Sequence, residues 1–404
     1  MFEEFSPVSK KEWLDKIEQD LKGRSPVELD WEPEPGLRVS PFAHPDDLPE
    51  PPPPMLKKQP GLQWLIGEDF DRLNLTNFDR LSPADFDNYD SAEKLNEELL
   101  QALSFGLESP RLIFTSPRES SSIPPLPWLE RALKNVELSF ITPYFFFAGA
   151  SEEELLDFID FLDSLYGKSD PASPAGLRQH AGSISVGTRK AALSGSRLAK
   201  AREKLPAYRF IRQSIPGTAR EGIVAPMQQA LHDAWATFGE SQLPLSDFNS
   251  LFYFQLETGP DYLLEIARLR ALRLLWANAL DQHGLNTEEE QAFLDIHLRF
   301  PTVSEQQENP TSETQQEIIN KHMIAAAPMA LAAIAGGADR LTIPPAGNQT
   351  NAFTRRIARN VHHILRMESG LDAVADPFAG SVYVEKLTRE ICERMENEKW
   401  RMEN

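Results

Sequence analysis

Residues 251–280, "LFYFQLETGPDYLLEIARLRALRLLWANAL", place a short apolar run directly before a long helical pattern. The run is rich in aromatic and aliphatic side chains, which favours a buried strand. The leucines and isoleucines that follow recur with the period of a helix. A strand followed at once by a helix is the repeating unit of parallel α/β proteins. This stretch therefore predicts one β/α unit.

The same alternation continues along most of the chain. We predict strands at 62–67, 111–115, 137–142, 208–213, 251–256, 294–299 and 340–343, with helices between most of them, including 152–167, 223–239 and 261–280. An eighth strand is expected at 103–109 or at 183–188. Eight parallel strands favour a closed barrel over an open sheet, and no Gly-rich phosphate loop follows any of them. We predict an α/β fold, a (β/α)8 TIM barrel with an N-terminal arm and a C-terminal helical extension, which accounts for all 404 residues.

The first 56 residues form the predicted arm. Residues 9–22 show the pattern of a capped amphipathic helix, with Ser9 at the cap and Glu12 three positions later. The prolines that follow exclude a helix or a central strand, so this part should be extended. Because such an arm has no core of its own, it either lies along the main domain or grips a partner. Its apolar anchors are Trp31, Leu37, Val39 and Phe42.

Residues 57–345 are the predicted barrel, a substrate-type domain, and residues 346–404 are the helical extension. The first helix of the extension should end at Gly370, where a left-handed residue closes a helix. Arg366 lies in its last turn, where the helix dipole favours a cation. Residues 359–387 of the extension are expected to pack against the barrel, with no direct role in bond making.

Composition narrows the range of functions. The formal net charge is −20, which would repel a nucleic-acid backbone. Cys392 is the one cysteine, which excludes an internal disulfide and a cysteine-based zinc cluster. The Ala-rich stretch around Pro328 is too short to cross a bilayer comfortably, and the acidic start does not resemble a signal peptide. We expect a cytoplasmic protein with neither nucleic acid nor membrane as a partner.

Four residues are candidates for contact with a substrate. His297 and Arg299 stand two apart, hence on one side of a strand and near its carboxyl end, where barrel enzymes keep their sites. An inward histidine is as readily a hydrogen-bonded core residue. Thr218 and Arg220 follow Gly217 in "GTARE", a combination that can cradle a phosphate. The related segment "ISVGTRK", 184–190, has the same composition.

No catalytic, cofactor-binding or metal-binding residue is predicted. His362 and His363 are adjacent, so on a helix their side chains diverge by about 100 degrees and do not share a metal readily. We expect them to be solvated or to lie in an interface. Bulky rings on inward strand positions would fill the axis of a barrel, although alternation turns only about half of them inward. The rings concerned are Phe145, Phe146, Phe147, Phe252, Tyr253 and Phe254.

Four segments in order carry a family resemblance. They are "PVSKKEWLDKIEQDLKG" at 7–23, "LEIARLRALRLLWANAL" at 264–280, "LAAIAGGADRLTIPP" at 331–345 and "RRIARNVHHILRMESGLDAVADPFAGSVYVEKLT" at 355–388. With them the chain resembles the methylmalonyl-CoA mutase family, most of all its small, non-catalytic β subunit. The resemblance spans nearly the whole chain, and its last two segments are the most specific.

The resemblance implies a barrel that, in catalytic members, admits an acyl-CoA through its centre and stacks on adenosylcobalamin held by a separate C-terminal domain. Such members interconvert methylmalonyl-CoA and succinyl-CoA by radical chemistry that the cofactor supplies. Here the cobalamin signature DxHxxG is absent, and we expect the sequence to stop where the linker to that domain would begin. Gly217 and Thr218 stand where catalytic members have a Tyr-His pair. Adenosylcobalamin is thus implied for the family complex and is not expected to bind this chain alone.

Three hypotheses follow. The leading one is a structural small-subunit-type component that partners a catalytic mutase chain as a heterodimer, or that forms a homodimer. The alternative is the acyl-CoA-binding barrel of an active mutase, completed by a separate cobalamin-binding chain. The third is an unrelated barrel lyase or hydrolase that uses carboxylates or His297.

Overall fold

The computed structural model describes residues 8–48, 62–71, 90–114, 123–166, 181–187, 193–217, 222–285, 291–300, 315–348 and 350–402. Its main sheet contains nine parallel strand segments, in the spatial order β7-β6-β5-β4-β3-β11-β10-β9-β8. Their bounds are β3 Leu65–Asp71, β4 Ser109–Phe114, β5 Tyr144–Phe147, β6 Ala181–Val186, β7 Ala207–Arg209, β8 Ile211–Ile215, β9 Phe252–Thr258, β10 Leu294–Leu298 and β11 Arg340–Thr342.

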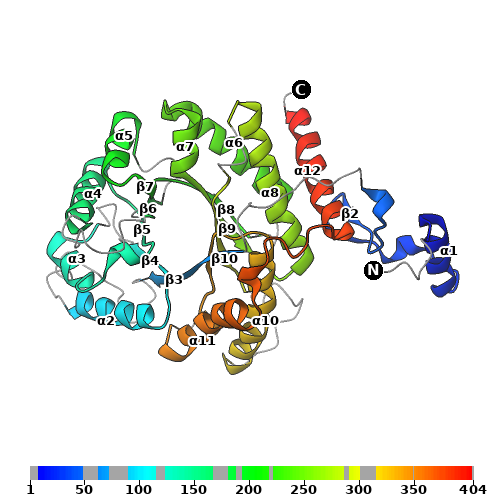
Figure 1. The fold of residues 1–404 in the computed structure, drawn as a ribbon, viewed down its shortest axis with the longest axis horizontal. Helices are drawn as coiled ribbons and strands as arrows, with labels where there is room; N and C mark the ends of the chain where they lie inside the picture. Colours follow the sequence, from blue (N-terminus) through cyan, green and yellow to red (C-terminus); the bar gives the residue numbers. More distant parts are fainter. Residues whose placement is uncertain are drawn as a thin grey trace.

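The two ends of this sheet meet. Strands β7 and β8 are separated in the chain by Phe210 alone, so they are two halves of one strand, the first paired with β6 and the second with β9. The sheet therefore closes on itself around eight strand positions. This confirms the predicted (β/α)8 barrel, and Figure 1 shows its ring of strands inside a ring of helices.

Helices cover the outside of the barrel. In chain order they are α2 Asp90–Ser104, α3 Leu126–Ala132, α4 Glu152–Tyr166, α5 Gly195–Lys204, α6 Val224–Ser241, α7 Leu245–Leu251, α8 Tyr262–Gln282, α10 Gln315–Ala335 and α11 Ala352–His363. Helix α11 follows the last strand, and its Arg355 and Arg359 both pair with Glu68 of β3. Helix α11 therefore covers the place where the last barrel strand, β11, pairs with the first, β3.

Six of the seven predicted strands overlap observed strands, and the one at 137–142 is wrong. That segment contains a 3-10 helix, Leu138–Phe140, and strand β5 begins only after Pro143. Both sides of Pro143 are apolar, so hydrophobicity alone did not distinguish them. The eighth strand is β6, which overlaps 183–188, whereas 103–109 covers the end of α2 and a turn with Gly106 at φ +81° before β4 begins.

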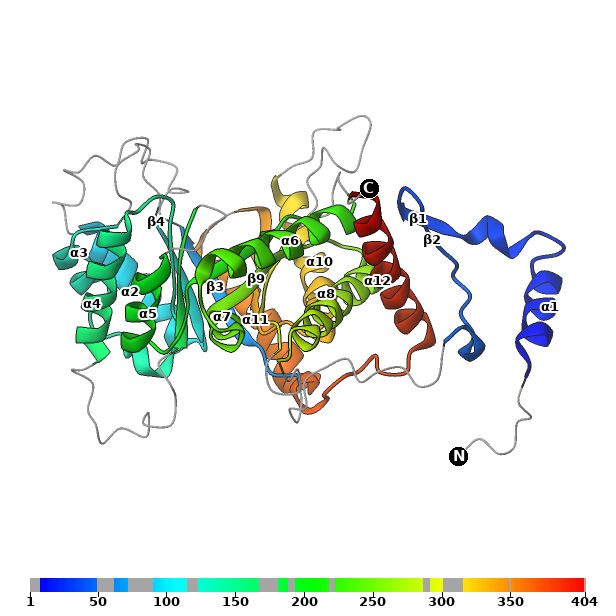
Figure 2. The same cartoon turned by 90° about the horizontal axis from the view of Figure 1, so that it is seen from above.

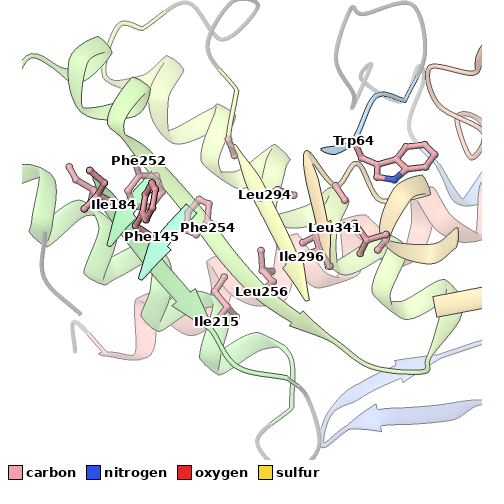
Figure 3. Close-up of a cluster of buried hydrophobic side chains, with 14 of the residues drawn as sticks. Trp64, Phe145, Ile184, Ile215, Phe252, Phe254, Leu256, Leu294, Ile296 and Leu341 are labelled. Atoms are coloured by element: carbon pink, nitrogen blue, oxygen red, sulfur yellow. The ribbon is translucent and has the colours of Figure 1, made fainter. Parts of the chain in front are cut away.

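The apolar core lies between the strands and the helices. Figure 3 shows Phe145, Phe252 and Phe254 in this layer with aliphatic side chains of neighbouring strands. The centroid of the Phe145 ring lies 4.9 Å from that of Phe158 in α4, and Phe252 stacks on Trp276 of α8 at 5.0 Å. These rings therefore pack outward and hold the helices rather than filling the axis.

Helix α10 also belongs to this layer. Among the described helices, α10 is long and apolar enough to cross a bilayer. However, 44% of its most apolar 18-residue stretch is buried inside the protein. It packs on α8, α11, β10 and β11. Packing on the barrel accounts for its apolar character.

The arm contains α1 Lys10–Asp20, 3-10 helices at Pro26–Leu29 and Pro45–Asp47, and an antiparallel pair, β1 Trp31–Glu34 and β2 Leu37–Val39. Ser9 and Glu12 form the predicted capping box. Leu37 and Val39 are buried. The prolines at 49–56 lie outside the described residues.

The arm contacts the C-terminal helix α12, Val382–Met402, as well as α6. Figures 1 and 2 show the arm on the far side of α12 from the barrel, with α1 furthest out. Helix α12 is itself tied to α8, because Arg270 pairs with Asp376 and with Glu385, each at 2.7 Å. The extension thus packs against the barrel wall, and Gly370 ends its first helical stretch at φ 61°, as predicted.

Candidate functional site

Charged side chains meet at the axis of the barrel. Arg340 of β11 pairs with Asp295 of β10 at 2.7 Å, and both are fully buried. Its Nε donates to Ser109 Oγ at 2.9 Å and its Nη2 to the Ser109 carbonyl at 3.0 Å. The guanidinium also lies 4.6 Å from the ring centroid of Tyr144. Arg340 is therefore neutralised, hydrogen-bonded and stacked at once.

A second layer of charges lies beside the first. Arg111 of β4 donates to both oxygens of Asp69, from Nε at 3.0 Å and from Nη2 at 2.5 Å. His297 Nε2 lies 3.1 Å from Asp295 Oδ2 and 3.2 Å from Arg111 Nη1. We call Arg340, Asp295, His297, Arg111 and Asp69 the axial network.

The cations of the axial network keep its two carboxyl groups, Asp295 and Asp69, ionised. Burial by itself raises the pKa of the Asp295 carboxyl, but Arg340, His297 and Arg111 together hold that pKa far below its ordinary value. The pKa of Asp69 is lowered as well, since burial is outweighed by Arg111, His297 and Arg340. Both groups are therefore held as carboxylates, which suits ion pairing and not proton donation.

Aromatic rings cross the axis next to this network. Tyr144 of β5 and Tyr253 of β9 meet edge to face with centroids 5.9 Å apart, although their strands are not neighbours in the sheet. Ser183 donates to the Tyr253 hydroxyl at 3.1 Å. Burial raises the pKa of Tyr144 well above its ordinary value. The interior at this level is thus filled by rings and paired charges.

The structure describes two of the four predicted site residues, His297 and Arg299, which lie in and just after strand β10. His297 is a member of the axial network, 12% exposed, and Arg299 lies just past the end of β10. Gly217 lies beside Arg299: a Cβ added to Gly217 would stand 3.2 Å from Arg299 Cδ. Thr218 and Arg220 lie outside the described residues.

Helix α8 positions this end of the barrel through a residue that sequence reasoning missed. Arg268 is fully buried and pairs with Glu265 at 3.1 Å. It donates to the carbonyls of Glu257 at 3.0 Å and Pro216 at 3.2 Å, at the ends of β9 and β8. The sequence feature that could have indicated this role of Arg268 is its place in a helix that is apolar on most faces. A charged side chain in such a helix requires buried partners.

The expectation for His362 was wrong. The residue is 1% exposed and its Nδ1 accepts a hydrogen bond from Trp64 Nε1 at 3.1 Å. Burial, with Arg366 and His363 nearby, lowers the pKa of His362 to about 3, so its ring is neutral. His363 is partly exposed and contacts the Phe105 carbonyl at 3.0 Å. In the part of the chain that the structure describes, no group of three or more His, Cys, Asp or Glu side chains could hold a metal ion.

The methylmalonyl-CoA mutase family model matches residues 230–403, from α6 to α12. Over its whole length the chain is 27% identical to a methylmalonyl-CoA mutase small subunit of Porphyromonas gingivalis and spans 63% of that protein.

Other relatives match a shorter part of the chain with higher sequence identity. A small subunit of Streptomyces virginiae is 36% identical over 34% of this chain and 21% of its own length. A large subunit of Propionibacterium freudenreichii subsp. shermanii is 32% identical over 39% of this chain and 21% of its own length. The chain thus spans under two thirds of these relatives. By the family match over residues 230–403 and the similarity along all of its residues, the chain is similar to methylmalonyl-CoA mutases.

Proposed function

We propose that this chain is a small-subunit-type component of an adenosylcobalamin-dependent methylmalonyl-CoA mutase and that it supports a catalytic partner without itself converting acyl-CoA. The axial network carries this proposal. A thioester that entered along the axis would have to displace the Arg340–Asp295 pair and the Tyr144–Tyr253 contact. Separating a buried ion pair leaves an uncompensated charge and costs about 3–5 kcal/mol. The barrel then acts as a scaffold.

Three of the described histidines do not fit a cobalt ligand. In this family cobalamin supplies the radical, and a histidine that held its cobalt would need an open ring nitrogen. Three histidines that the structure describes are otherwise engaged: His297 in the axial network, His322 by the Gly347 N–H at 3.1 Å and His362 by Trp64. We assign no cobalamin ligand to this chain and propose that its partner binds the cofactor.

The partner that we propose is a large-subunit-type mutase chain. Relatives named small and large subunits point to such a complex. The arm supports it further: Val27 and Leu29 are 52% and 41% exposed on a segment that projects beyond α12. Exposed apolar side chains on a projecting segment are typical of an interaction surface.

Calorimetric titration with methylmalonyl-CoA tests the scaffold role. The chain alone should give no heat of binding, whereas a large-subunit-type chain loaded with cobalamin, used as the positive control, should bind. Binding to the chain alone with a Kd of about 10 μM or tighter would contradict a filled axis. Turnover by this chain with a cobalamin-binding domain, and no other barrel, would establish the alternative instead.

A further inference from the structure

Arg212 differs from the other arginines of the axis. It is the second residue of β8, and its guanidinium stacks 4.8 Å from the centroid of Phe146 on β5. Since β5 and β8 are not neighbours in the sheet, this contact lies inside the barrel. Nη2 also reaches the carbonyl of Val186, the last residue of β6, at 3.2 Å. The guanidinium therefore lies toward the carboxyl ends of the strands, where barrels bind ligands.

The charge of Arg212 is not neutralised by the axial network. Asp69 and Asp295 are each taken by another guanidinium, at 2.5 Å from Arg111 and 2.7 Å from Arg340. Among the described residues no carboxylate lies within 4.0 Å of Arg212. Its acceptors are the neutral oxygens of Gln255, at 2.8 Å, and Val186.

The hydrogen bonds of Arg212 are also incomplete. A guanidinium has five N–H donors, and two of them are used. Its Nε is buried and has no acceptor among the residues that the structure describes. Burial lowers the pKa of Arg212, and Arg111 lowers it too, which together outweigh the opposite effects of Tyr253 and Asp295. A buried donor and a buried charge without partners are both costly, and one bound anion would satisfy both.

Arg209 provides a contrast within the same strand pair. It is equally a cation near the axis, but its Nη1 donates to the carbonyls of Ser250 at 3.0 Å and Phe252 at 2.8 Å. The first of these carbonyls belongs to the last turn of α7, whose negative dipole end favours a cation. Burial lowers the pKa of Arg209 as well. Among the described residues, however, Arg209 donates to a helix end, whereas Arg212 has neither a helix end nor a carboxylate as its acceptor.

We propose that Arg212 anchors a binding site for a small oxyanion, a carboxylate or a phosphate, at the carboxyl end of the barrel, with Gln255 orienting the guanidinium. The planar fork of arginine matches two oxygens of such a group. The site takes a compact anion and does not require the open axis that a long thioester chain would need. It is therefore independent of whether the chain binds acyl-CoA.

Thermal unfolding of the whole chain at constant ionic strength tests the site, with phosphate, acetate and chloride as separate ligands. Saturating oxyanion should raise the Tm of the wild type by about 2–4 °C, and chloride should do so less. The rise should vanish in Arg212→Gln and persist in Arg209→Gln, the matched loss of a charge. An equal rise in wild type and Arg212→Gln, or no rise in the wild type, would overturn the proposal.

The wild type can also be tested without a variant. Crystals soaked in selenate should show an anomalous peak within hydrogen-bond distance of the Arg212 guanidinium, and selenate bound only elsewhere would contradict the site. If Arg212→Gln does not fold, Arg212→Lys keeps the charge but loses the fork and should weaken oxyanion binding roughly tenfold. Unchanged affinity in that variant would argue against Arg212 as the anchor.

Discussion

Asp295 joins both layers of the axial network, since one of its oxygens meets Arg340 and the other meets His297. Few side chains could replace it. Asparagine has nearly the same shape but no charge, so it would leave Arg340 buried without a counter-ion. The contribution of Asp295 is therefore electrostatic rather than steric.

We predict that Asp295→Asn lowers the free energy of unfolding by about 3–5 kcal/mol at neutral pH, the range for breaking a buried pair. Urea unfolding measures this. Asp20→Asn is the control, because its pair with Lys16 is exposed on both sides and such pairs contribute about 0–1 kcal/mol. An equal decrease in the free energy of unfolding of the two variants would show that the buried axial pair stabilises the fold no more than an exposed pair does.

The same carboxylate predicts a pH dependence. Its pKa is depressed in the folded state, so its contribution is complete above the ordinary Asp value of about 3.9 and is lost as the pH falls below it. Stability of the wild type should therefore decrease below about pH 4 more steeply than that of Asp295→Asn. Parallel curves for the two proteins would contradict this assignment.

His362 predicts a pH dependence in a different range. Its folded pKa of about 3 lies below the unfolded value of about 6.5, so protonation favours the unfolded chain. Protonation of this residue alone should lower the free energy of unfolding of the wild type by about 2 kcal/mol between pH 7.5 and pH 5. In His362→Gln that loss should disappear, whereas it should remain in His363→Gln, as urea unfolding at several pH values can show.

At the scale of elements, the β/α alternation was sufficient to predict the barrel. Strand β9 begins with three aromatic residues, and β10 alternates leucine and isoleucine with polar residues, so both carry a clear strand signal. Shorter strands were harder. Strand β5 has four residues and stands one proline after an equally apolar 3-10 helix. Hydrogen bonding to β4 and β6 determines which segment is the strand, and the local sequence does not encode it.

The site was predicted in part for the same reason. The two-residue spacing of His297 and Arg299 indicated one side of a strand, and His297 of β10 does face the axial network, while Arg299 lies just after the strand. The partners of His297 were not predictable, since Asp69 and Arg111 come from strands that lie far away in the chain. Arg268 and Arg212 were missed because a single arginine in an apolar run does not show which carbonyls or rings will surround it.

Helix α6 depends on the arm for its cap. Its own N-cap residue, Ile223, supplies no side-chain acceptor, and Glu34 of β1 accepts from the N–H groups of Ile223 at 2.5 Å and Val224 at 3.2 Å. A carboxylate at a helix N-terminus also interacts favourably with the dipole. The hairpin of the arm is therefore joined to α6, one of the helices that cover the barrel.

We predict that Glu34→Ala destabilises the chain by about 1–2 kcal/mol and releases the arm to limited trypsin digestion. Arg394 of α12, 3.7 Å from Glu34, would lose a counter-charge in the same variant. Glu28→Ala is the control, since Glu28 forms only an exposed pair with Arg24. Digestion of the arm at the same rate in wild type and Glu34→Ala would show that the cap does not hold it.

At the scale of the whole molecule, the arm has two different parts. The hairpin is fixed on α6 and α12, whereas α1 contains no buried residue and projects furthest from the barrel. Exposed apolar residues of the arm are Val8, Val27, Leu29 and Trp31. Three of these residues, Val27, Leu29 and Trp31, stand directly before or in the anchored hairpin, which fits a partner that approaches beyond α12.

We therefore predict that Val27→Asp with Leu29→Asp leaves the Tm of the isolated chain within about 1 °C, because neither side chain is buried. The same pair should weaken association with a large-subunit-type mutase chain at least tenfold, since two charges would be buried in the interface. Phe140→Asp is the matched control, as Phe140 is 53% exposed outside the arm. Co-elution on gel filtration and titration calorimetry measure the effect. Undiminished association of the double variant would place the interface elsewhere, and the arm would then serve only the fold of its own chain.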